Sequence, residues 1–294
     1  MFNRRTLSVL EDWKRAKSHK PILLRGARQI GKSYLMEEFA KSFDHSVSIN
    51  LEFDKDLHEY FKLLDPDLIL SRIFLLKGVD LKQSGKNLLI LDEIQDCPDA
   101  IVVLRYFYEK MPDLYVIGAG SLLELVLDDH SISVPVGRMH YIYMEPMSFI
   151  EYLQAIGSNP LAQYIKALTL KTKVDKVVHH KLIEEFKNYL LLGGMPGVIL
   201  AYVENGKSFA KAFVEQKSIL ETYRDDLKKY GTVTEHKYLR RVFDTLASMV
   251  GGKYIYSRVD KDSKSKSIKY AYEILTQVGL SKKIKNTSPH SLPL

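Results

Sequence analysis

A glycine-rich segment near the N-terminus matches one phosphate-binding pattern at every fixed position. Residues 26–33 spell Gly-Ala-Arg-Gln-Ile-Gly-Lys-Ser, which fits G-x-x-x-x-G-K-[ST]. A short apolar run at residues 21–25 precedes this loop, and a helical pattern at residues 34–40 follows it. In the order strand, loop, helix, the loop N–H groups and the helix N-terminus face a bound anion. The pattern therefore predicts an α/β fold organised around a phosphate site.

The residues of this loop have distinct expected tasks. Gly26 and Gly31 allow the backbone to turn sharply and to approach phosphate closely. Lys32 is expected to reach the β- and γ-phosphates of a nucleotide, and the Ser33 hydroxyl is expected to ligate Mg²⁺. A glycine-rich turn that binds nothing would not explain Lys32 and Ser33 at their offsets. The predicted nucleotide-binding residues are Gly26, Ala27, Arg28, Gln29, Ile30, Gly31, Lys32 and Ser33.

Arg28 occupies a variable position of the pattern, and we expect it to be exposed. The single cysteine of the chain, Cys97, excludes an intramolecular disulfide and a cysteine-based zinc site. Cys97 lies just past an acidic motif, and a role as a small buried packing residue is favoured over a role as a nucleophile.

A second motif completes the predicted site. Residues 88–91 form an apolar run that ends in Asp92 and Glu93. Acidic side chains on a buried strand are expected only at its end, where they are paired or metal-bound. Asp92 is predicted to hold Mg²⁺, directly or through water, and Glu93 to activate the attacking water as a general base. Because a simple kinase has little use for such a glutamate, the pair favours ATP hydrolysis at a Walker A/Walker B site.

Two further residues are candidates for catalysis. Ser121 follows the next predicted strand, and ligands gather at the carboxyl ends of parallel strands. Ser121 either bonds the γ-phosphate or the attacking water, or only caps a helix over residues 122–127; both interpretations fit the sequence. Arg138 could bring positive charge to a γ-phosphate in its own subunit or in a neighbour.

The order of predicted elements divides the chain into three parts. The predicted strands cover residues 21–25, 47–51, 87–91, 114–117 and 139–144. Because helical segments separate them, they predict a parallel sheet sandwiched by helices. After residue 146, helices are predicted over residues 148–157, 176–192, 208–230, 235–250 and 264–278. The expected domains are a P-loop core (1–150), a helical region (151–222) and a winged-helix-like segment (223–294).

The net charge of +7 is unevenly distributed. Residues 1–150 hold 19 Lys and Arg against 22 Asp and Glu, whereas residues 223–294 hold 15 against 7. A helix over 264–278 and a short strand over 280–284 outline a winged helix, whose second helix meets DNA with its first turn. Its exposed start carries Lys264, Lys266 and Lys269. Duplex DNA is therefore one candidate partner for residues 223–294, and a structural winged helix with a solvated basic surface is the alternative.

No signal peptide or membrane span is predicted. The N-terminus lacks the apolar run of a signal peptide. The longest mostly apolar stretch, residues 189–203, is broken by glycine and proline and is too short to span a bilayer. A cytoplasmic protein without membrane contact is therefore expected.

The chain resembles bacterial and archaeal AAA-type ATPases of the AAA+ superfamily that pair a P-loop core with a C-terminal domain of unknown function. The resemblance rests on residues 26–33 and 91–95, with further matches at residues 120–121, 136–138, 146–151, 193–196 and 224–227. It implies Mg²⁺ and ATP as ligands, Asp92 and Glu93 as the acidic pair, and Ser121 as a sensor. Arg138 matches the pattern without an implied role.

Two departures from this family are visible. Many members have threonine in place of Ser33, which leaves the chemistry unchanged. Members also continue beyond the residues that match the end of this chain, so the resemblance implies a further C-terminal region that is absent here. Cores of this type often form rings in which a neighbour's arginine completes the site, so a homo-oligomer is a candidate.

The leading interpretation is an ATPase that couples hydrolysis to conformational change in its C-terminal domains. The alternative is an ATP-gated DNA-binding regulator with marginal turnover. A third interpretation, a degenerate ATPase that serves as a scaffold, conflicts with the intact Lys32, Asp92 and Glu93.

Overall fold

The structure is a computed structural model of the 294-residue chain, and it describes residues 2–121, 123, 137–230, 233–259 and 265–284. The chain forms two compact units, Met1–Lys217 and Ser218–Leu294, which divide within helix α11 (Phe209–Asp226). The helices that follow residue 150 thus belong to the same compact unit as the sheet up to Lys217. The three-domain division expected from the sequence stays a prediction.

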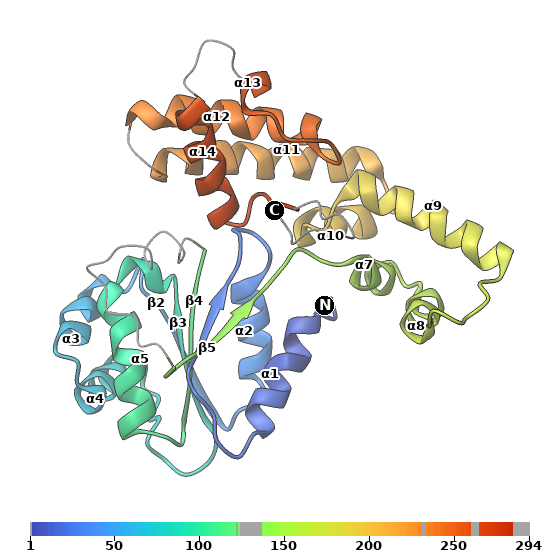
Figure 1. Ribbon diagram of the computed structural model, residues 1–294. Coiled ribbons are helices and arrows are strands. Elements are labelled where there is room, and N and C mark those ends of the chain that lie inside the picture. Colours follow the sequence, from blue (N-terminus) through green and yellow to red (C-terminus); the bar gives the residue numbers. More distant parts are fainter. Residues whose placement is uncertain (1, 122, 124–136, 231–232, 260–264, 285–294) are drawn as a thin grey trace. The chain divides into compact units, whose positions relative to one another are not determined.

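A five-stranded sheet forms the centre of the first unit, with the strand order β2-β3-β4-β1-β5 (Figure 1). Its strands are β1 (Ile22–Arg25), β2 (His45–Asn50), β3 (Asn87–Asp92), β4 (Leu114–Gly120) and β5 (His140–Tyr143). All four pairings are parallel, which confirms the predicted sheet. Because the strands are parallel, the loops that follow β1, β3 and β4 meet at one edge.

Helices cover both faces of this sheet (Figure 1). On one face lie α1 (Arg5–Arg15) and α2 (Lys32–Ala40). On the other lie α3 (His58–Lys62), α4 (Pro66–Lys77) and α5 (Pro98–Lys110), with the short 3₁₀ turns η1 (Lys55–Leu57) and η2 (Ile94–Asp96). Local signals set the ends of α4, because Asp65 caps it, Pro66 opens it and Gly78 closes it in the left-handed region.

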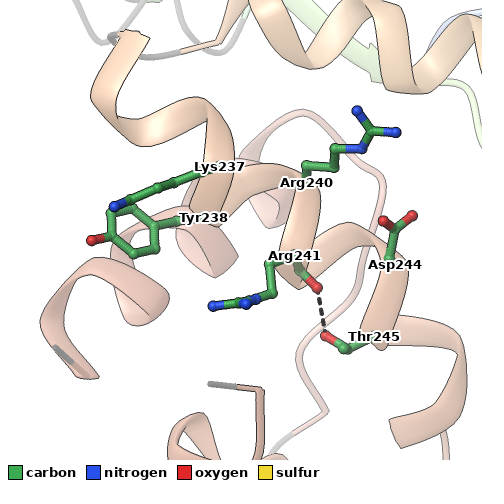
Figure 2. A pocket seen from close by; sticks show the side chains of 6 residues that line it. All are labelled: Lys237, Tyr238, Arg240, Arg241, Asp244 and Thr245. Carbon is green, nitrogen blue, oxygen red and sulfur yellow. Dashed lines mark hydrogen bonds between the residues drawn. The ribbon is translucent and has the colours of Figure 1, made fainter. Parts of the chain in front are cut away.

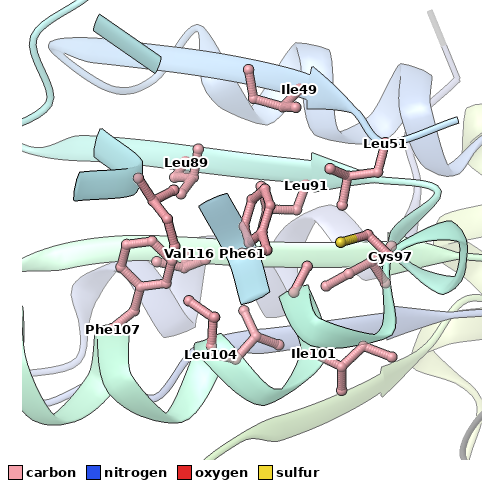
Figure 3. Close-up of a cluster of buried hydrophobic side chains, with 14 of the residues drawn as sticks. Ile49, Leu51, Phe61, Leu89, Leu91, Cys97, Ile101, Leu104, Phe107 and Val116 are labelled. Atoms are coloured by element: carbon pink, nitrogen blue, oxygen red, sulfur yellow. The ribbon is translucent and has the colours of Figure 1, made fainter. Parts of the chain in front are cut away.

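Each face has its own hydrophobic core. Helices α3 to α5 pack on β2, β3 and β4 through fully buried side chains such as Phe61, Leu91 and Phe107 (Figure 3). Cys97 belongs to this cluster, and burial raises the pKa of its thiol to about 11. The cysteine is therefore a packing residue, as predicted, because a protonated buried thiol is a poor nucleophile.

Four complete helices and the first half of α11 extend the described part of the first unit beyond the sheet. The complete helices are α7 (Phe149–Ala155), α8 (Asn159–Ala167), α9 (Lys176–Leu192) and α10 (Pro196–Glu204). The sequence analysis predicted α7 and α9 but missed α8 and α10. It treated the glycine and proline residues within 189–203 only as breaks in an apolar stretch, whereas Pro196 opens α10, at a position where proline is tolerated.

None of the described helices is by itself long and apolar enough to cross a bilayer. Helices α9 and α10 reach that length and apolarity only as a pair, and the chain bends by 117° between them.

The second unit is helical throughout its described part. It contains the end of α11, the turns η3 (Leu227–Lys229) and η4 (Ala247–Met249), and helices α12 (Val233–Leu246), α13 (Tyr256–Val259) and α14 (Ser265–Gln277). Helices α12 and α14 pack together, with side chains such as Leu239, Val242, Ile268 and Leu275 buried in this unit.

The predicted winged helix is not confirmed. The strand expected over residues 280–284 does not form, because the N–H groups of Leu280 and Ser281 instead donate to the carbonyl of Leu275 and close the end of α14. A strand also needs a partner for its backbone groups, and the described part of this unit contains no other strand. Lys264 lies outside the described residues, as do residues 124–127 of the helix predicted after Ser121.

Candidate nucleotide site at the carboxyl edge of the sheet

The loop between β1 and α2 depends on its two glycines. Gly26 has a φ of +147° and Gly31 a φ of +88°, values that L side chains rarely adopt. A Cβ atom on Gly26 would also lie 2.3 Å from the Met144 carbonyl oxygen and 2.4 Å from Cδ1 of Ile30. The loop therefore packs so closely against the end of β5 that only glycine fits at position 26.

Lys32 lies inside this loop rather than in solvent. Its side chain is 7% exposed, and its Nζ donates to the carbonyl oxygens of Gly26 and Ala27, both at 2.9 Å. Burial lowers the pKa of Lys32 to about 8, although the carboxylates of Glu93 and Asp92 oppose the shift. The ammonium group is therefore held close to two acidic side chains and to the loop that it closes.

The structure corrects the expectation for Arg28. Its side chain is half-buried rather than exposed. It lies near enough to Lys32 for its positive charge to contribute to the lowered pKa of that residue. A long side chain in a loop that folds back on itself loses solvent even at a variable position.

Ser33 and Asp92 come together at the end of β3. The Ser33 hydroxyl donates to Oδ2 of the buried Asp92 at 2.7 Å, and the Glu93 N–H donates to Oδ1 at 3.0 Å. No group of three or more His, Cys, Asp or Glu side chains forms a metal cage among the described residues. A hydroxyl beside a carboxylate next to a phosphate-binding loop suits Mg²⁺, which takes few protein ligands and completes its shell with phosphates and water.

Glu93 stands in a strained backbone conformation directly after this carboxylate. Its φ of +48° is uncommon for a residue with a side chain. Its Oε2 accepts a hydrogen bond from Nε2 of Gln95 at 2.7 Å, and the same nitrogen donates to Asp96 at 3.1 Å. Gln95 thus holds one oxygen of the predicted general base in place.

Two glycines of β4 make room for this turn, and the sequence analysis missed their role. A Cβ atom on Gly120 would lie 2.1 Å from Oε1 of Gln95, and one on Gly118 would lie 2.6 Å from Cδ1 of Ile94. The turn after β3 therefore rests directly on β4. The signal was a Gly-x-Gly pattern at the end of the strand that follows the acidic pair.

Ser121 lies at the same edge. It follows Gly120, which is in register with Arg25, the last residue before the phosphate loop. Its side chain is buried, and its Oγ has no hydrogen-bond partner among the described residues. Buried hydroxyls are nearly always hydrogen-bonded, so a buried hydroxyl without a described partner beside a phosphate-binding loop is suited to bind a ligand. The capping alternative concerns a helix outside the described residues.

The structure does not bring Arg138 to this site. Arg138 precedes β5, whose first residue, His140, is in register with Ile22 at the start of β1. Its Nε donates at 3.2 Å to Glu109, near the end of α5. Both observations place Arg138 at the amino edge of the sheet, opposite the loop. Any contact of Arg138 with a γ-phosphate would therefore involve the nucleotide of another subunit.

Two family models match separate parts of the chain. Residues 18–153 match a family model described as an AAA domain, and residues 183–293 match a domain of unknown function. No curated protein matches the chain.

Several solved structures are similar to the chain at low identity. The ORC2 protein of Aeropyrum pernix, solved as ADPNP and ADP complexes, is 13% identical over 97% of this chain and 86% of its own, with a TM-score of 0.48. AMPPCP-bound DnaA from Aquifex aeolicus is 15% identical over 92% and 86%, with a TM-score of 0.40. The ORC1 protein of Aeropyrum pernix in complex with DNA is 12% identical over 93% and 81%, with a TM-score of 0.35.

Proposed function

We propose that the chain binds ATP with Mg²⁺ and hydrolyses it; residues 18–153 match the model of an AAA domain, and residues 183–293 match that of a domain of unknown function. One observation carries the proposal. The 2.7 Å hydrogen bond from Ser33 to Asp92 joins the phosphate loop to the acidic strand end across 59 residues of sequence, and Glu93 is the next residue. A glycine-rich turn without a ligand would not need this arrangement.

In this proposal, different residues of the site bind the phosphates and the Mg²⁺ ion. The loop N–H groups and the start of α2 bind phosphate oxygens, because an N-terminal helix end attracts anions. Lys32 exchanges its bonds to the loop carbonyls for phosphate oxygens. Ser33 and Asp92 would hold Mg²⁺, which neutralises phosphate charge when bound.

The proton chemistry falls to Glu93 in this proposal. Its carboxylate accepts a proton from the attacking water, while Gln95 keeps Oε2 in a fixed direction. The Ser121 hydroxyl, which is buried without a described partner, donates to the γ-phosphate or to that water. Hydrolysis at this edge would then alter the position of the helices that follow the sheet.

Nucleotide binding and steady-state hydrolysis test the proposal directly. The Lys32→Ala variant is expected to lose ATP binding and turnover by about 10²-fold or more, since a charged group that clamps the phosphates is removed. Lys41→Ala, at the C-cap of the same helix, is the matched control, because Lys41 is exposed and pairs only with Glu38 among the described ion pairs. A wild-type protein that neither binds nor hydrolyses ATP would overturn the proposal.

A second candidate function is nucleotide-gated binding of nucleic acid, and one observation in the second unit favours it. A hollow of about 430 Å³ lies on α12, and Figure 2 shows its lining. The lining residues are Lys237, Tyr238, Arg240, Arg241, Asp244 and Thr245. Three cations within two turns of one helix suit the phosphates of a nucleic-acid backbone.

Helix α14 is the weaker candidate for nucleic-acid contact. Lys266 and Lys269 are exposed at its start, but Lys269 is 3.7 Å from Glu273. On α12, the single acid of the hollow, Asp244, is paired at 3.1 Å with Arg224. With three cations against one acid, the lining of the hollow carries a net positive charge.

Binding of duplex DNA at several salt concentrations tests this second candidate. The expected result is an affinity that falls steeply as salt rises, with a dependence on ATP. Absent or salt-insensitive binding would leave the ATPase proposal standing and remove this one.

A further inference from the structure

An arginine outside every motif reaches the phosphate loop. Arg4 precedes α1, and its side chain is only 7% exposed. Its Nη1 donates to the carbonyl oxygen of Ile30 at 2.9 Å, its Nε donates to Glu151 at 3.1 Å, and its Nη2 donates to the carbonyl oxygen of Glu145. One guanidinium group thus joins the loop, the segment after β5 and helix α7.

Glu151 compensates the buried positive charge. Its Oε1 accepts from Nε of Arg4 and from the N–H of Arg5, the latter at 2.9 Å. Its Oε2 accepts from the N–H and the hydroxyl of Ser148, the N-cap of α7. Burial alone would raise the pKa of Glu151, but these donors outweigh it and lower the pKa, so the carboxylate stays ionised. Arginine suits this position because its planar donors reach several acceptors at once.

The hydrogen bond from Arg4 to the Ile30 carbonyl fixes the Ile30–Gly31 peptide group, which lies within the phosphate loop. Because a trans peptide is planar, the N–H of Gly31 points opposite to the carbonyl that Arg4 holds. Gly31 itself is conformationally permissive and has a φ of +88°, so the loop alone does not hold this peptide in one direction. The carbonyl bond therefore sets the direction of an N–H that belongs to the phosphate-binding series.

Gly31 of the phosphate loop lies near the start of helix α10. A Cβ atom on Gly31 would lie 3.9 Å from Cγ of Pro196, the first residue of α10. The Gly194 carbonyl, two residues earlier, accepts from the N–H of Met147, next to the α7 cap. Helices α7 and α10 are thus both anchored beside the same loop.

We propose that Arg4 is a positioning residue of the nucleotide site, which holds the Ile30–Gly31 peptide ready for phosphate and is itself held by Glu151. The proposal rests on the nucleotide binding proposed above. It goes beyond that function because it assigns the loop geometry to a residue at the N-terminus and links that geometry to the start of α7.

The test compares affinity for a fluorescent ADP analogue with thermal stability. Arg4→Lys keeps the charge but cannot serve three acceptors, so its ADP affinity is expected to fall about tenfold or more at a temperature where the protein is fully folded. Glu151→Gln, which removes the countercharge, is expected to show a smaller loss. Arg15→Ala, at the C-terminal end of α1, is the control, since Arg15 is exposed and pairs only within α1 among the described ion pairs.

A purely structural role would give a different result. The melting temperature would fall equally with and without ADP, and the affinity below melting would stay at the wild-type value. If both Arg4→Lys and Glu151→Gln gave that result, the positioning role of Arg4 would be overturned, while the proposed nucleotide binding would stand. Wild-type protein without ADP affinity would overturn the proposed function, and the role of Arg4 with it.

Discussion

The phosphate loop of the first unit and helix α12 of the second unit both concentrate positive charge, but they do so in opposite environments. Lys32 is buried among loop carbonyls and carboxylates, and its pKa is lowered to about 8. Lys237, Arg240 and Arg241 are exposed on one helix. A buried cation with fixed neighbours selects one ligand geometry, whereas exposed cations attract any polyanion in proportion to its charge. The first region is therefore suited to a ligand of defined geometry, and the second is suited to polyanions in general.

The largest effect expected from this contrast concerns Glu93. Glu93→Gln should lower ATP turnover by about 10²–10⁴-fold, the usual contribution of general-base catalysis, and should leave ATP binding intact. Turnover and equilibrium binding measured on one preparation check the separation. The control is Glu59→Gln on α3, whose side chain is exposed at a distance from the loop. Equal loss of binding and turnover would show that Glu93 shapes the site rather than activating water.

The next effect tests whether β4 positions the catalytic turn. Gly120→Ala would place a Cβ atom 2.1 Å from Oε1 of Gln95, so Gln95 must move and release Glu93. Turnover should fall about 10- to 100-fold, because small misplacements of a catalytic group are costly, while ADP affinity changes little. Gly252→Ala in the second unit is the control, since its nearest neighbour would be 3.7 Å away. Unchanged turnover would mean that Gln95 does not position the carboxylate.

A pH titration tests the buried character of Lys32. Bound phosphate favours the charged form of Lys32 and raises its pKa, so the complex keeps a proton that the free protein loses above about pH 8. ADP affinity should therefore be constant below pH 8 and fall by up to about tenfold per pH unit above it. Lys32→Arg, which stays charged, should remove this fall even if its affinity is lower. A flat profile for the wild type would argue against a lowered pKa.

The smallest effect is expected on α12. Replacing Lys237, Arg240 and Arg241 together with glutamine should reduce the slope of log affinity for duplex DNA against log salt by about 2–3, roughly one for each lost phosphate contact. The matched variant replaces Lys266 and Lys269 on α14 and should change the slope less. ATP hydrolysis in the absence of DNA should be unaffected by either set. Identical slopes for both variants and the wild type would remove α12 as the contact surface.

The sequence analysis was most accurate where it used signals that are local in the sequence. The strands β1 to β5 and helices α7 and α9 were predicted within a few residues, because periodicity and end signals are local. The prediction of a strand over residues 280–284 was wrong, because such a short apolar pattern is also compatible with the end of a helix. Helix α10 was missed because Pro196 was taken as a breaker when it opens a helix. The sequence analysis did not single out the cations of α12, although Lys237, Arg240 and Arg241 stand three and four residues apart in a predicted helix and therefore share one face.

The sequence by itself determined the chemistry that this protein can offer to phosphate, because eight consecutive residues carry the loop and four apolar residues lead to Asp92 and Glu93. Only the tertiary structure decided which distant groups meet there. Parallel strand order brings Ser33 to Asp92 and lays the turn at Gln95 on Gly120. It also places Arg138 at the opposite edge and lets Arg4 meet Glu151 across 147 residues. Such contacts depend on the register of strands and on buried charges finding partners, which no local pattern encodes.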